Sequence, residues 1–359
     1  MLKTFDEVFD DYTKYGTKIK TEQYHTIGSN IIIDQGQSDI AGYTDQTDGL
    51  FTDVPVIIFG DHTRIIKYIN RPFFLGADGT KILKSKLPNA NYKYLYYALK
   101  NAKIPNTGYN RHFKWLKQIS ILYPEYQKQR IVVEILDKLE DSIDNYNTML
   151  RLLDKLVKAR FIEMFKSVND KVTIGSLCDV TSGYSFKSKD INSSNGIKLL
   201  QIGNVFFDNV NWETVNYLPD GYNIKYSKFL LNEGDIVVAL TRPIIQSLGN
   251  VKACVVRELD VPCLLNQRVG RITPKKNIDT NLKFIYECLM MNDFTKYVES
   301  CCIGCSQPNI SVHDIENYLV PNVSFKQQER FMLFKKQVDK SRFDIKKSII
   351  ELEREVVYD

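Results

Sequence analysis

The sequence predicts an α+β protein with an internal repeat: two mixed α/β domains, each followed by a long helix, with the two helices packed as an antiparallel coiled coil. Three observations predict this arrangement. A stretch that starts at Glu125 recurs from Phe325, apolar residues follow each copy at helical spacing, and strand-like segments bounded by turns precede each copy. Because domain and helix both occur twice, the repeat implies an internal pseudo-two-fold relationship.

The repeated stretch reads EYQKQRIVVEIL in its first copy and FKQQERFMLF in its second, and it places Arg130 and Arg330 200 positions apart. Solenoid repeats have periods of about 20–50 residues, so this copy is a whole module. The predicted boundaries are 1–123 and 169–323 for the two domains, and 124–168 and 324–359 for the helices that follow them.

The first domain opens with the clearest strand signals. Val54–Gly60 and Ile65–Ile69 are rich in β-branched and aromatic residues, and a short polar turn separates them. The stretch YKYLYYALKNA, from Tyr92, then predicts a short helix. The domain is therefore mixed α/β.

The first long helix is predicted from its apolar seam, because no Gly or Pro interrupts the chain from Glu125 to Lys166. At 1.5 Å per residue the helix is roughly 60 Å long. One apolar stripe does not stabilise such a helix in water, so it needs a partner helix. Eight apolar residues are separated alternately by four and three positions, the coiled-coil spacing: Val132, Leu136, Leu139, Ile143, Tyr146, Leu150, Leu153 and Val157.

The second domain repeats this plan, with strand-like IVVAL, ACVVREL and RVGRITP and a helix-like NLKFIYECLMM. Ser324 and Gln327 then have capping-box spacing, which predicts a helix start. The seam of this second helix is less regular than the first and contains Phe331, Phe334, Val338, Ile345, Ile349, Leu352 and Val356.

Bulk composition excludes several classes. The formal charge of +5 permits a polyanionic partner without requiring one. The amino terminus lacks a signal-peptide pattern, and no run is long and apolar enough to cross a bilayer. The seven cysteines are an odd count, which fits reduced thiols in the cytoplasm.

Two unlike domains on one pseudo-two-fold frame suit a target with two unlike half-sites, and double-stranded DNA offers groove faces that recur every ~34 Å. At this point the chain resembles the specificity subunits of type I DNA restriction–modification systems. The residues that carry the resemblance are the stretch from Pro124 through ILDKLEDSI, its second copy from Pro321, and the two domains before them.

The resemblance implies that each domain is a target recognition domain that reads one half of a bipartite, asymmetric DNA site. It implies that the helices set the spacing and dock two modification (adenine-methyltransferase) subunits, through which the restriction (motor/nuclease) subunits join. S-adenosylmethionine, ATP and magnesium are then expected on those partner subunits and no cofactor on this chain.

Motifs for catalysis are absent from the sequence. It contains no G-x-x-x-x-G-K-[ST] phosphate loop and no Asn/Asp/Ser-Pro-Pro-Tyr/Phe adenine-methyltransferase signature. The CCIGC stretch, Cys301–Cys305, holds one CxxC, but a zinc site usually needs a second pair of ligands. We therefore expect neither a catalytic centre nor a metal site.

Candidate DNA contacts lie in polar turns and loops, where Arg, Lys, His, Ser and Thr can reach phosphates and base edges. Arg pairs well with guanine, and Asn or Gln with adenine. Each residue taken singly is more often plain surface, so the hypothesis concerns the set. Its members are His62, Thr63, Arg64, Arg111, His112, Lys114, Tyr184, Ser185, Lys187, Lys189, Thr241, Arg242, Ser306, Gln307 and Asn309.

Two other interpretations remain open. The chain could be a coiled-coil adaptor that binds only proteins, in which case sequence-specific, salt-sensitive DNA binding is not expected. It could also be an enzyme with an unrecognised site. The charged outer faces of the helices are either solvated surface or docking surface for methyltransferase subunits, in particular LEDSIDN and RLLDKLVKAR.

Overall fold

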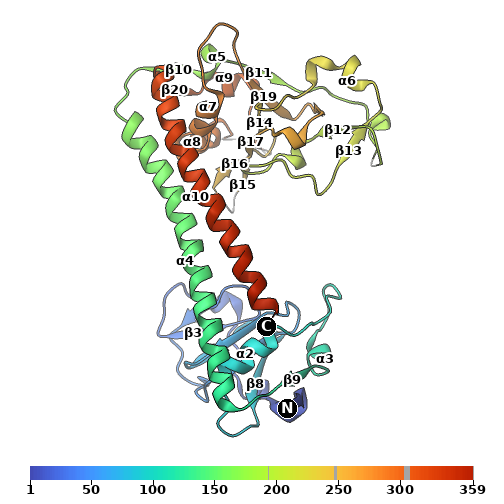
Figure 1. Ribbon diagram of the computed structural model, residues 1–359, viewed down its shortest axis with the longest axis vertical. Helices are drawn as coiled ribbons and strands as arrows, with labels where there is room; N and C mark the ends of the chain where they lie inside the picture. The colour runs from blue at the N-terminus through green and yellow to red at the C-terminus, as the bar shows by residue number, and fades with distance from the viewer. Residues whose placement is uncertain (193, 246–248, 303–307, 359) are drawn as a thin grey trace. The chain divides into compact units, whose positions relative to one another are not determined.

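The computed structural model describes residues 1–192, 194–245, 249–302 and 308–358 (Figure 1). The chain divides into two compact units, Met1–Thr148 with the carboxy-terminal stretch from Lys346, and Met149–Ile345. Each unit therefore contains one globular domain and a part of each long helix.

The first unit contains two small sheets and a strand pair. One sheet has the order β2-β8-β5-β6, the other β4-β3-β7, and β1 pairs with β9. The strands are β1 (Leu2–Thr4), β2 (Phe9–Asp11), β3 (Asn30–Ile33), β4 (Gly42–Thr44), β5 (Val56–Gly60), β6 (Ile66–Ile69), β7 (Phe73–Leu75), β8 (Thr80–Ser85) and β9 (Ser120–Leu122). The helices that complete the domain are α1 (Phe5–Val8), α2 (Tyr92–Lys100) and α3 (Phe113–Leu116).

The core of the first unit explains these elements. All five residues of β5 are buried, because it is an inner strand whose apolar side chains pack on both faces of the sheet. On one side, Phe59 packs with Leu95 of α2. The helix begins at Tyr92 because the Asn91 side chain caps it, accepting from the Tyr94 N–H at 3.1 Å.

The second unit repeats the architecture with additions. Its sheets have the orders β11-β19-β14-β17 and β13-β12-β18, and the strand pairs are β10-β20 and β15-β16. The strands are β10 (Lys171–Thr173), β11 (Cys178–Ser182), β12 (Ile197–Leu200), β13 (Asn216–Leu218), β14 (Ile236–Ala239), β15 (Ile244–Ile245), β16 (Asn250–Val251), β17 (Ala253–Val255), β18 (Cys263–Leu265), β19 (Val269–Pro274) and β20 (Leu319–Pro321). The helices are α5 (Ile174–Leu177), α6 (Tyr222–Lys225), α7 (Leu282–Leu289), α8 (Asn292–Cys301) and α9 (Val312–Asn317).

Strand order and direction confirm the repeat. In both units the four-stranded sheet is antiparallel throughout. In both three-stranded sheets the middle strand, β3 or β12, has one antiparallel and one parallel neighbour. The helices α6 and α8 have no counterpart in the first unit, so the two domains share a frame and differ in what is inserted into it.

The long helices begin with the same device. α4 (Tyr126–Phe165) and α10 (Phe325–Tyr358) each bury a glutamine in the first turn, Gln129 and Gln328. The Gln129 amide donates to the Pro124 carbonyl at 2.8 Å, and the Gln328 amide to the Val323 carbonyl at 3.1 Å. These glutamines therefore define the structural match, which is one residue off the Arg130–Arg330 match read from the sequence.

The predicted capping box at the second helix is confirmed. The Gln327 side chain accepts from the Ser324 N–H at 3.0 Å, and the Gln327 N–H donates to the Ser324 hydroxyl at 3.4 Å. α10 accordingly begins at Phe325.

Within the second unit the two helices are antiparallel. Asp154 forms an ion pair with Arg342, whereas Phe161, further along α4, contacts Phe331, which lies earlier on α10. Figure 1 shows α4 (green) beside α10 (red) over this length. The predicted pairing of the helices is therefore confirmed here, and the predicted seam residue Phe331 contacts Phe161, which the predicted seam did not include.

Most predicted seam positions are shielded from solvent. Val157, Phe331, Val338 and Ile345 are buried. The half-buried ones are Leu136, Leu139, Ile143, Tyr146, Leu150, Leu153, Phe334, Ile349 and Leu352.

Two predicted seam positions remain, Val132 and Val356. Val132 is 36% exposed, so its assignment to the seam is wrong; the adjacent Val133 packs on the first domain instead. The Val356 side chain lies outside the described part of the structure.

Candidate nucleic-acid interface

The turn after β5 presents three predicted contact residues, His62, Thr63 and Arg64. The Arg64 N–H donates to the Gly60 carbonyl at 2.7 Å, which closes the turn. The Thr63 hydroxyl donates to the Gln35 carbonyl at 2.6 Å. Arg64 has φ = 63°, a left-handed conformation that is uncommon for residues other than Gly, Asn and Asp. The surrounding hydrogen bonds hold the arginine in this geometry.

A second predicted segment packs against this turn. The His112 N–H donates to the Asp61 carbonyl at 2.8 Å, and its Nδ1 lies 3.0 Å from the same oxygen. His112 is fully buried, so the expectation that it contacts DNA is corrected: its imidazole holds the turn in place. Its neighbours Arg111 and Lys114 are exposed.

Tyr109 belongs to the same surface and was missed from the sequence. Its ring stacks on His62 with centroids 4.9 Å apart and an interplanar angle of 11°, while 89% of the residue remains exposed. Exposed aromatic rings of this kind can stack on nucleobases. The available sequence signal was an aromatic residue within the turn-rich NTGYNRH.

The corresponding turn of the second domain follows β14. Here the Arg242 N–H donates to the Pro308 carbonyl at 2.7 Å, and Thr241 forms an antiparallel bridge with Asn309. Arg242 also has a left-handed backbone, with φ = 46°. The structure therefore brings three predicted residues from two separate segments together. Ser306 and Gln307, predicted beside them, lie outside the described residues.

The remaining predicted contacts of the second domain lie at the same end of its sheet. The Gly183 N–H donates to the Val269 carbonyl, and the Leu240 N–H to the Arg268 carbonyl, so the segments after β11 and β14 both reach the start of β19. Tyr184 packs on Tyr226 with centroids 4.8 Å apart. The exposed members of the first segment are Tyr184, Ser185, Lys187 and Lys189.

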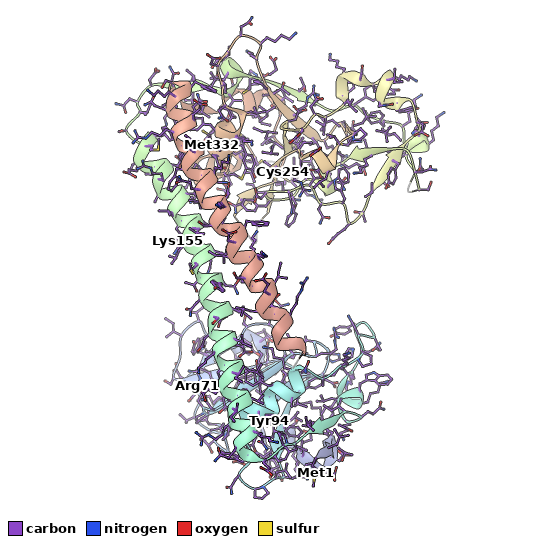
Figure 2. All side chains as sticks on the ribbon, viewed as in Figure 1. Met1, Arg71, Tyr94, Lys155, Cys254 and Met332 are labelled. Atoms are coloured by element: carbon purple, nitrogen blue, oxygen red, sulfur yellow. The ribbon has the colours of Figure 1, made fainter. Side chains whose placement is uncertain are left out.

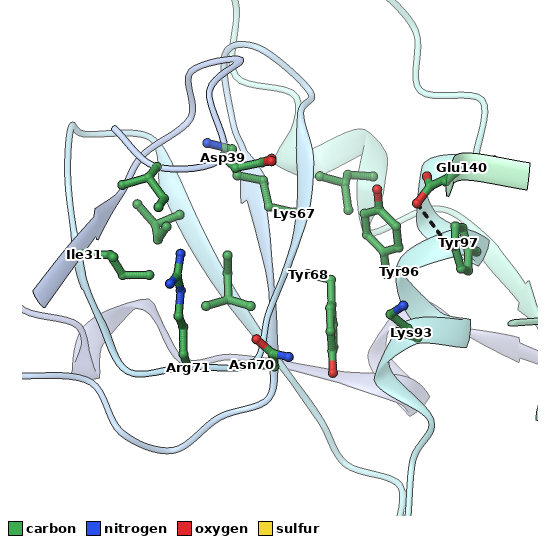
Figure 3. A pocket seen from close by; sticks show the side chains of 14 residues that line it. Ile31, Asp39, Lys67, Tyr68, Asn70, Arg71, Lys93, Tyr96, Tyr97 and Glu140 are labelled. Carbon is green, nitrogen blue, oxygen red and sulfur yellow. Dashed lines mark hydrogen bonds between the residues drawn. The ribbon is translucent and has the colours of Figure 1, made fainter. Parts of the chain in front are cut away.

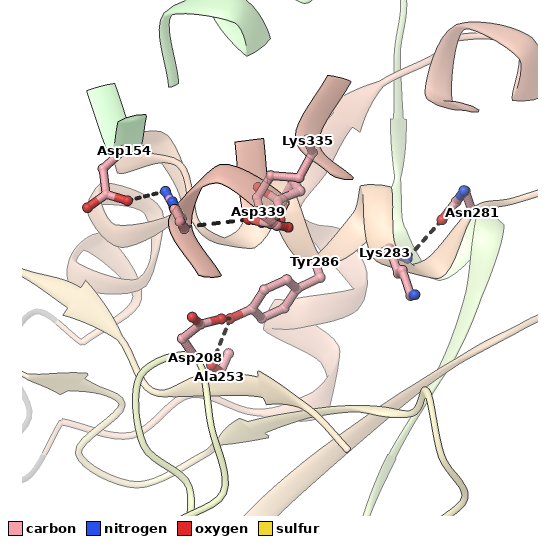
Figure 4. Close-up of polar contacts among 10 residues, drawn as sticks. Asp154, Asp208, Ala253, Asn281, Lys283, Tyr286, Lys335 and Asp339 are labelled. Carbon is pink, nitrogen blue, oxygen red and sulfur yellow. Dashed lines mark hydrogen bonds and ion pairs between the residues drawn. The ribbon is translucent and has the colours of Figure 1, made fainter. Parts of the chain in front are cut away.

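Polar contacts join each domain to its long helix. In the first unit, Tyr97 of α2 donates to Asp137 of α4 at 2.6 Å. In the second, Lys335 of α10 lies 3.2 Å from the carboxylate of Glu287 in α7 and pairs with Asp339 at 3.0 Å (Figure 4). Burial raises the pKa of Glu287. Burial opposes the charge on Lys335, but Glu287 and Asp339 together raise its pKa.

Two pockets are lined by residues that do not belong to these turns. One of 440 Å³ in the first unit is lined by Lys67, Tyr68, Arg71 and Tyr96, among others (Figure 3). The Lys67 ammonium donates to the Ser38 carbonyl at 2.6 Å, and burial lowers its pKa. One of 800 Å³ in the second unit lies among α4, α8 and β20. Neither lining contains a predicted DNA contact.

Four cysteines of the second unit are buried thiols, namely Cys178, Cys254, Cys263 and Cys288. Burial raises the pKa of Cys254 (Figure 2) and of Cys263 to about 12. Among the described residues, no group of three or more His, Cys, Asp or Glu side chains is arranged to hold a metal ion. No helix in the described part of the chain is long and apolar enough to cross a membrane.

The fold and paired turns define a duplicated two-domain protein whose exposed, basic loops occupy matching places in both halves. Comparison with known proteins identifies the family. Residues 167–354 match the model of the type I restriction modification DNA specificity domain. The chain is 30% identical over 299 residues to the type I restriction enzyme MjaVIII specificity subunit of Methanocaldococcus jannaschii, covering 74% of this chain and 69% of that subunit.

A shorter match involves the type I restriction enzyme EcoAI specificity subunit of Escherichia coli, 30% identical over 161 residues, or 44% of this chain and 26% of that subunit. Among solved structures, the type I restriction-modification S subunit from M. genitalium has 17% identity and a TM-score of 0.55, over 99% of this chain and 93% of that one. A chain from a study of complex assembly in the type I R-M system has 14% identity and a TM-score of 0.57, over 99% and 95%.

The chain thus belongs to the type I restriction–modification specificity subunits. Its role is that of the specificity subunit, and catalysis is not assigned to it. The two solved structures support the fold alone, since their sequence identities are low.

Proposed function

We propose that this chain is the DNA-recognition subunit of a type I restriction–modification complex, and that each domain reads one half of a bipartite, asymmetric target. The observation that carries the proposal is the pair of matching turns, one after β5 and one after β14. Each presents a Thr-Arg pair next to a second exposed segment, and those second segments differ between the domains.

Binding combines two kinds of contact. Lysine and arginine contacts to phosphates position the protein, and a few contacts to base edges specify the sequence. The exposed predicted residues supply both kinds, and Tyr109 adds a stacking surface. Because equivalent loops hold different side chains, the two half-sites differ.

The helices set the gap between the half-sites and dock two modification subunits, which methylate adenine. The face of α4 away from the seam supports docking. Met149, Leu152 and Leu156 follow one another at helical spacing on this face and are 46–55% exposed. A row of exposed apolar side chains is typical of a surface that a partner protein covers. Leu152 and Leu156 fall within the RLLDKLVKAR stretch.

The chemistry resides on the partner subunits. S-adenosylmethionine is bound by the modification subunits, and ATP and Mg²⁺ by the restriction subunits that join through them. This chain binds no cofactor and works in the cytoplasm, where the DNA is.

The proposal is tested with the complex of this chain and its modification subunits. Genome-wide adenine methylation is mapped in a host that carries the complete complex and in one that lacks only this chain. We expect a two-part methylated motif that disappears without the chain. Methylation by this chain alone would contradict the proposal and favour the enzyme alternative.

Binding distinguishes the adaptor alternative. The complex is titrated with the methylated motif as a duplex and with a scrambled duplex at increasing salt. We expect preference for the motif and a steep loss of affinity with salt. Equal, weak binding of both duplexes would favour a protein-only adaptor.

A further inference from the structure

We propose that Arg111 and Asn309 occupy one equivalent position of the two domains and determine the difference between the half-sites, with Arg111 reading guanine and Asn309 reading adenine. The inference rests on the proposed function and deepens it. It assigns individual bases to individual side chains.

Strand register establishes the equivalence. Leu83 of β8 lies opposite Ile57 of β5, and Ile272 of β19 lies opposite Ile236 of β14, so these strands superimpose in sequence order. Counting along the inner strand matches Gly60, opposite Thr80, with Ala239, opposite Val269. The residues that leave the strand are therefore Asp61 and Leu240.

The second segments meet these two residues through the same hydrogen bond. The His112 N–H donates to the Asp61 carbonyl at 2.8 Å, and the Ile310 N–H to the Leu240 carbonyl at 2.9 Å. His112 and Ile310 are both buried. The residue before each, Arg111 or Asn309, is exposed.

This arrangement fixes the backbone of the position while leaving its side chain available. A buried neighbour and a backbone hydrogen bond hold the main chain on one side. Within the described residues, neither the Arg111 guanidinium nor the Asn309 amide has a hydrogen-bond partner of its own. Arg111 does contribute to lowering the pKa of Asp78, after the hydrogen bond and charge of Lys18.

The chemistry of the two side chains differs in the way that base reading requires. A guanidinium donates two parallel hydrogen bonds to O6 and N7 of guanine, whereas a carboxamide both donates and accepts, matching N6 and N7 of adenine. Exchanging one for the other at a fixed backbone position therefore exchanges the preferred base.

The neighbouring arginines provide the contrast. Arg64 and Arg242 are arginines of the corresponding turns and both have a left-handed backbone, although by the register above Arg242 matches Thr63. An arginine that is present in both turns does not by itself distinguish the two half-sites. These arginines suit a feature common to both half-sites, the phosphate backbone, and Arg111 and Asn309 the differing bases.

The test uses the complete complex and the motif methylated by the wild type. Arg111→Asn is expected to change one base pair in one half-site from guanine to adenine, and Asn309→Arg one base pair in the other half from adenine to guanine. For each variant we compare the affinity for the wild-type duplex with the affinity for a duplex changed at that one base pair. The preference of the wild type for its own base pair should fall by roughly 5- to 150-fold in the variant. Arg64→Ala and Arg242→Ala weaken binding to all duplexes and leave the motif unchanged.

Three results overturn the inference: an unchanged motif in both exchange variants, a uniform loss of affinity for all duplexes, or a change in both half-sites from one substitution. Lys276→Ala, an exposed lysine beyond the other end of β19, is the control. Fluorescence of Trp115 and Trp212, one in each domain, verifies folding, and Arg111→Gln and Asn309→Gln serve if an exchange variant misfolds. If the wild type itself shows no two-part motif, the proposed function fails, whereas an intact motif that ignores both exchanges rejects only this inference.

Discussion

The rings of Phe161 and Phe331 meet nearly perpendicularly, with centroids 5.4 Å apart, and join the end of α4 to the start of α10. Phe331 is fully buried and also contacts Phe165 and Phe284. This aromatic cluster connects both long helices to α7 of the second domain. The helix pair and the domain therefore share one core.

Phe331→Ala is accordingly expected to destabilise the second unit by about 3–5 kcal/mol, the usual cost of a large cavity in a core. Urea unfolding followed by Trp212 fluorescence measures it. Phe343→Ala, at a position that is 69% exposed on the same helix, is the control and should change stability by less than about 0.5 kcal/mol. Equal effects of the two substitutions would contradict the packing described.

The two buried glutamines should differ in their contributions. Gln328 satisfies two groups, since its oxygen also accepts from the Asn281 N–H at 2.8 Å. Gln129 satisfies only the Pro124 carbonyl, and its oxygen has no partner in the described structure. We expect Gln328→Ala to cost about 1–3 kcal/mol and Gln129→Ala clearly less. Unfolding midpoints of the two variants measure the difference, and a larger loss for Gln129→Ala would refute this ranking.

Asp260 should make the second domain sensitive to acid. Burial acts to raise its pKa, but hydrogen bonds from Arg257 and Trp212 outweigh burial and lower it. A carboxylate with a lowered folded-state pKa stabilises above its unfolded value of ~3.9, and this contribution is lost as pH falls through the folded pKa. Stability is therefore expected to fall below about pH 4.

Asp260→Asn should flatten that acid dependence and cost about 1–3 kcal/mol at neutral pH. The measurement is Trp212 fluorescence across a pH series, in a chain that carries Trp115→Phe. An acid transition of undiminished size in the Asn variant would exclude Asp260 as its source.

The exposed apolar face of α4 should carry assembly. Leu152→Asp combined with Leu156→Asp places charge on that face and leaves the seam residues unchanged, so we expect the chain to fold. Its affinity for the modification subunits should fall by at least about 10-fold. Size-exclusion chromatography of the mixed subunits measures assembly. Lys155→Ala, in the same turn, is the matched control. Normal assembly of the double variant would show that docking occurs elsewhere.

Local patterns predicted the frame of the molecule. Val54–Gly60 became the buried strand β5, and Ser324 with Gln327 began α10, because strand composition and capping depend on residues close in sequence. The four-and-three alternation of the seam ends at Val157: Phe161 lies four residues after it, where a step of three would place Arg160, so the pattern does not predict Phe161 as a seam residue.

Other features depend on contacts between distant residues. His112 is buried because it meets a carbonyl 51 positions away, which no local pattern reveals. Val132 and Val133 look equivalent in sequence, and only the packing of the first domain on α4 selects Val133. The match of Arg111 with Asn309 likewise required the strand register.

The central claim is that the two domains are independent readers on one duplicated frame, and a domain exchange tests it most directly. Residues 1–123 are replaced by the corresponding domain of a relative, and the methylated motif of the complete complex is mapped. The account predicts that one half of the motif changes while the other half and the gap stay the same. A change in both halves, or an unchanged motif, would contradict it.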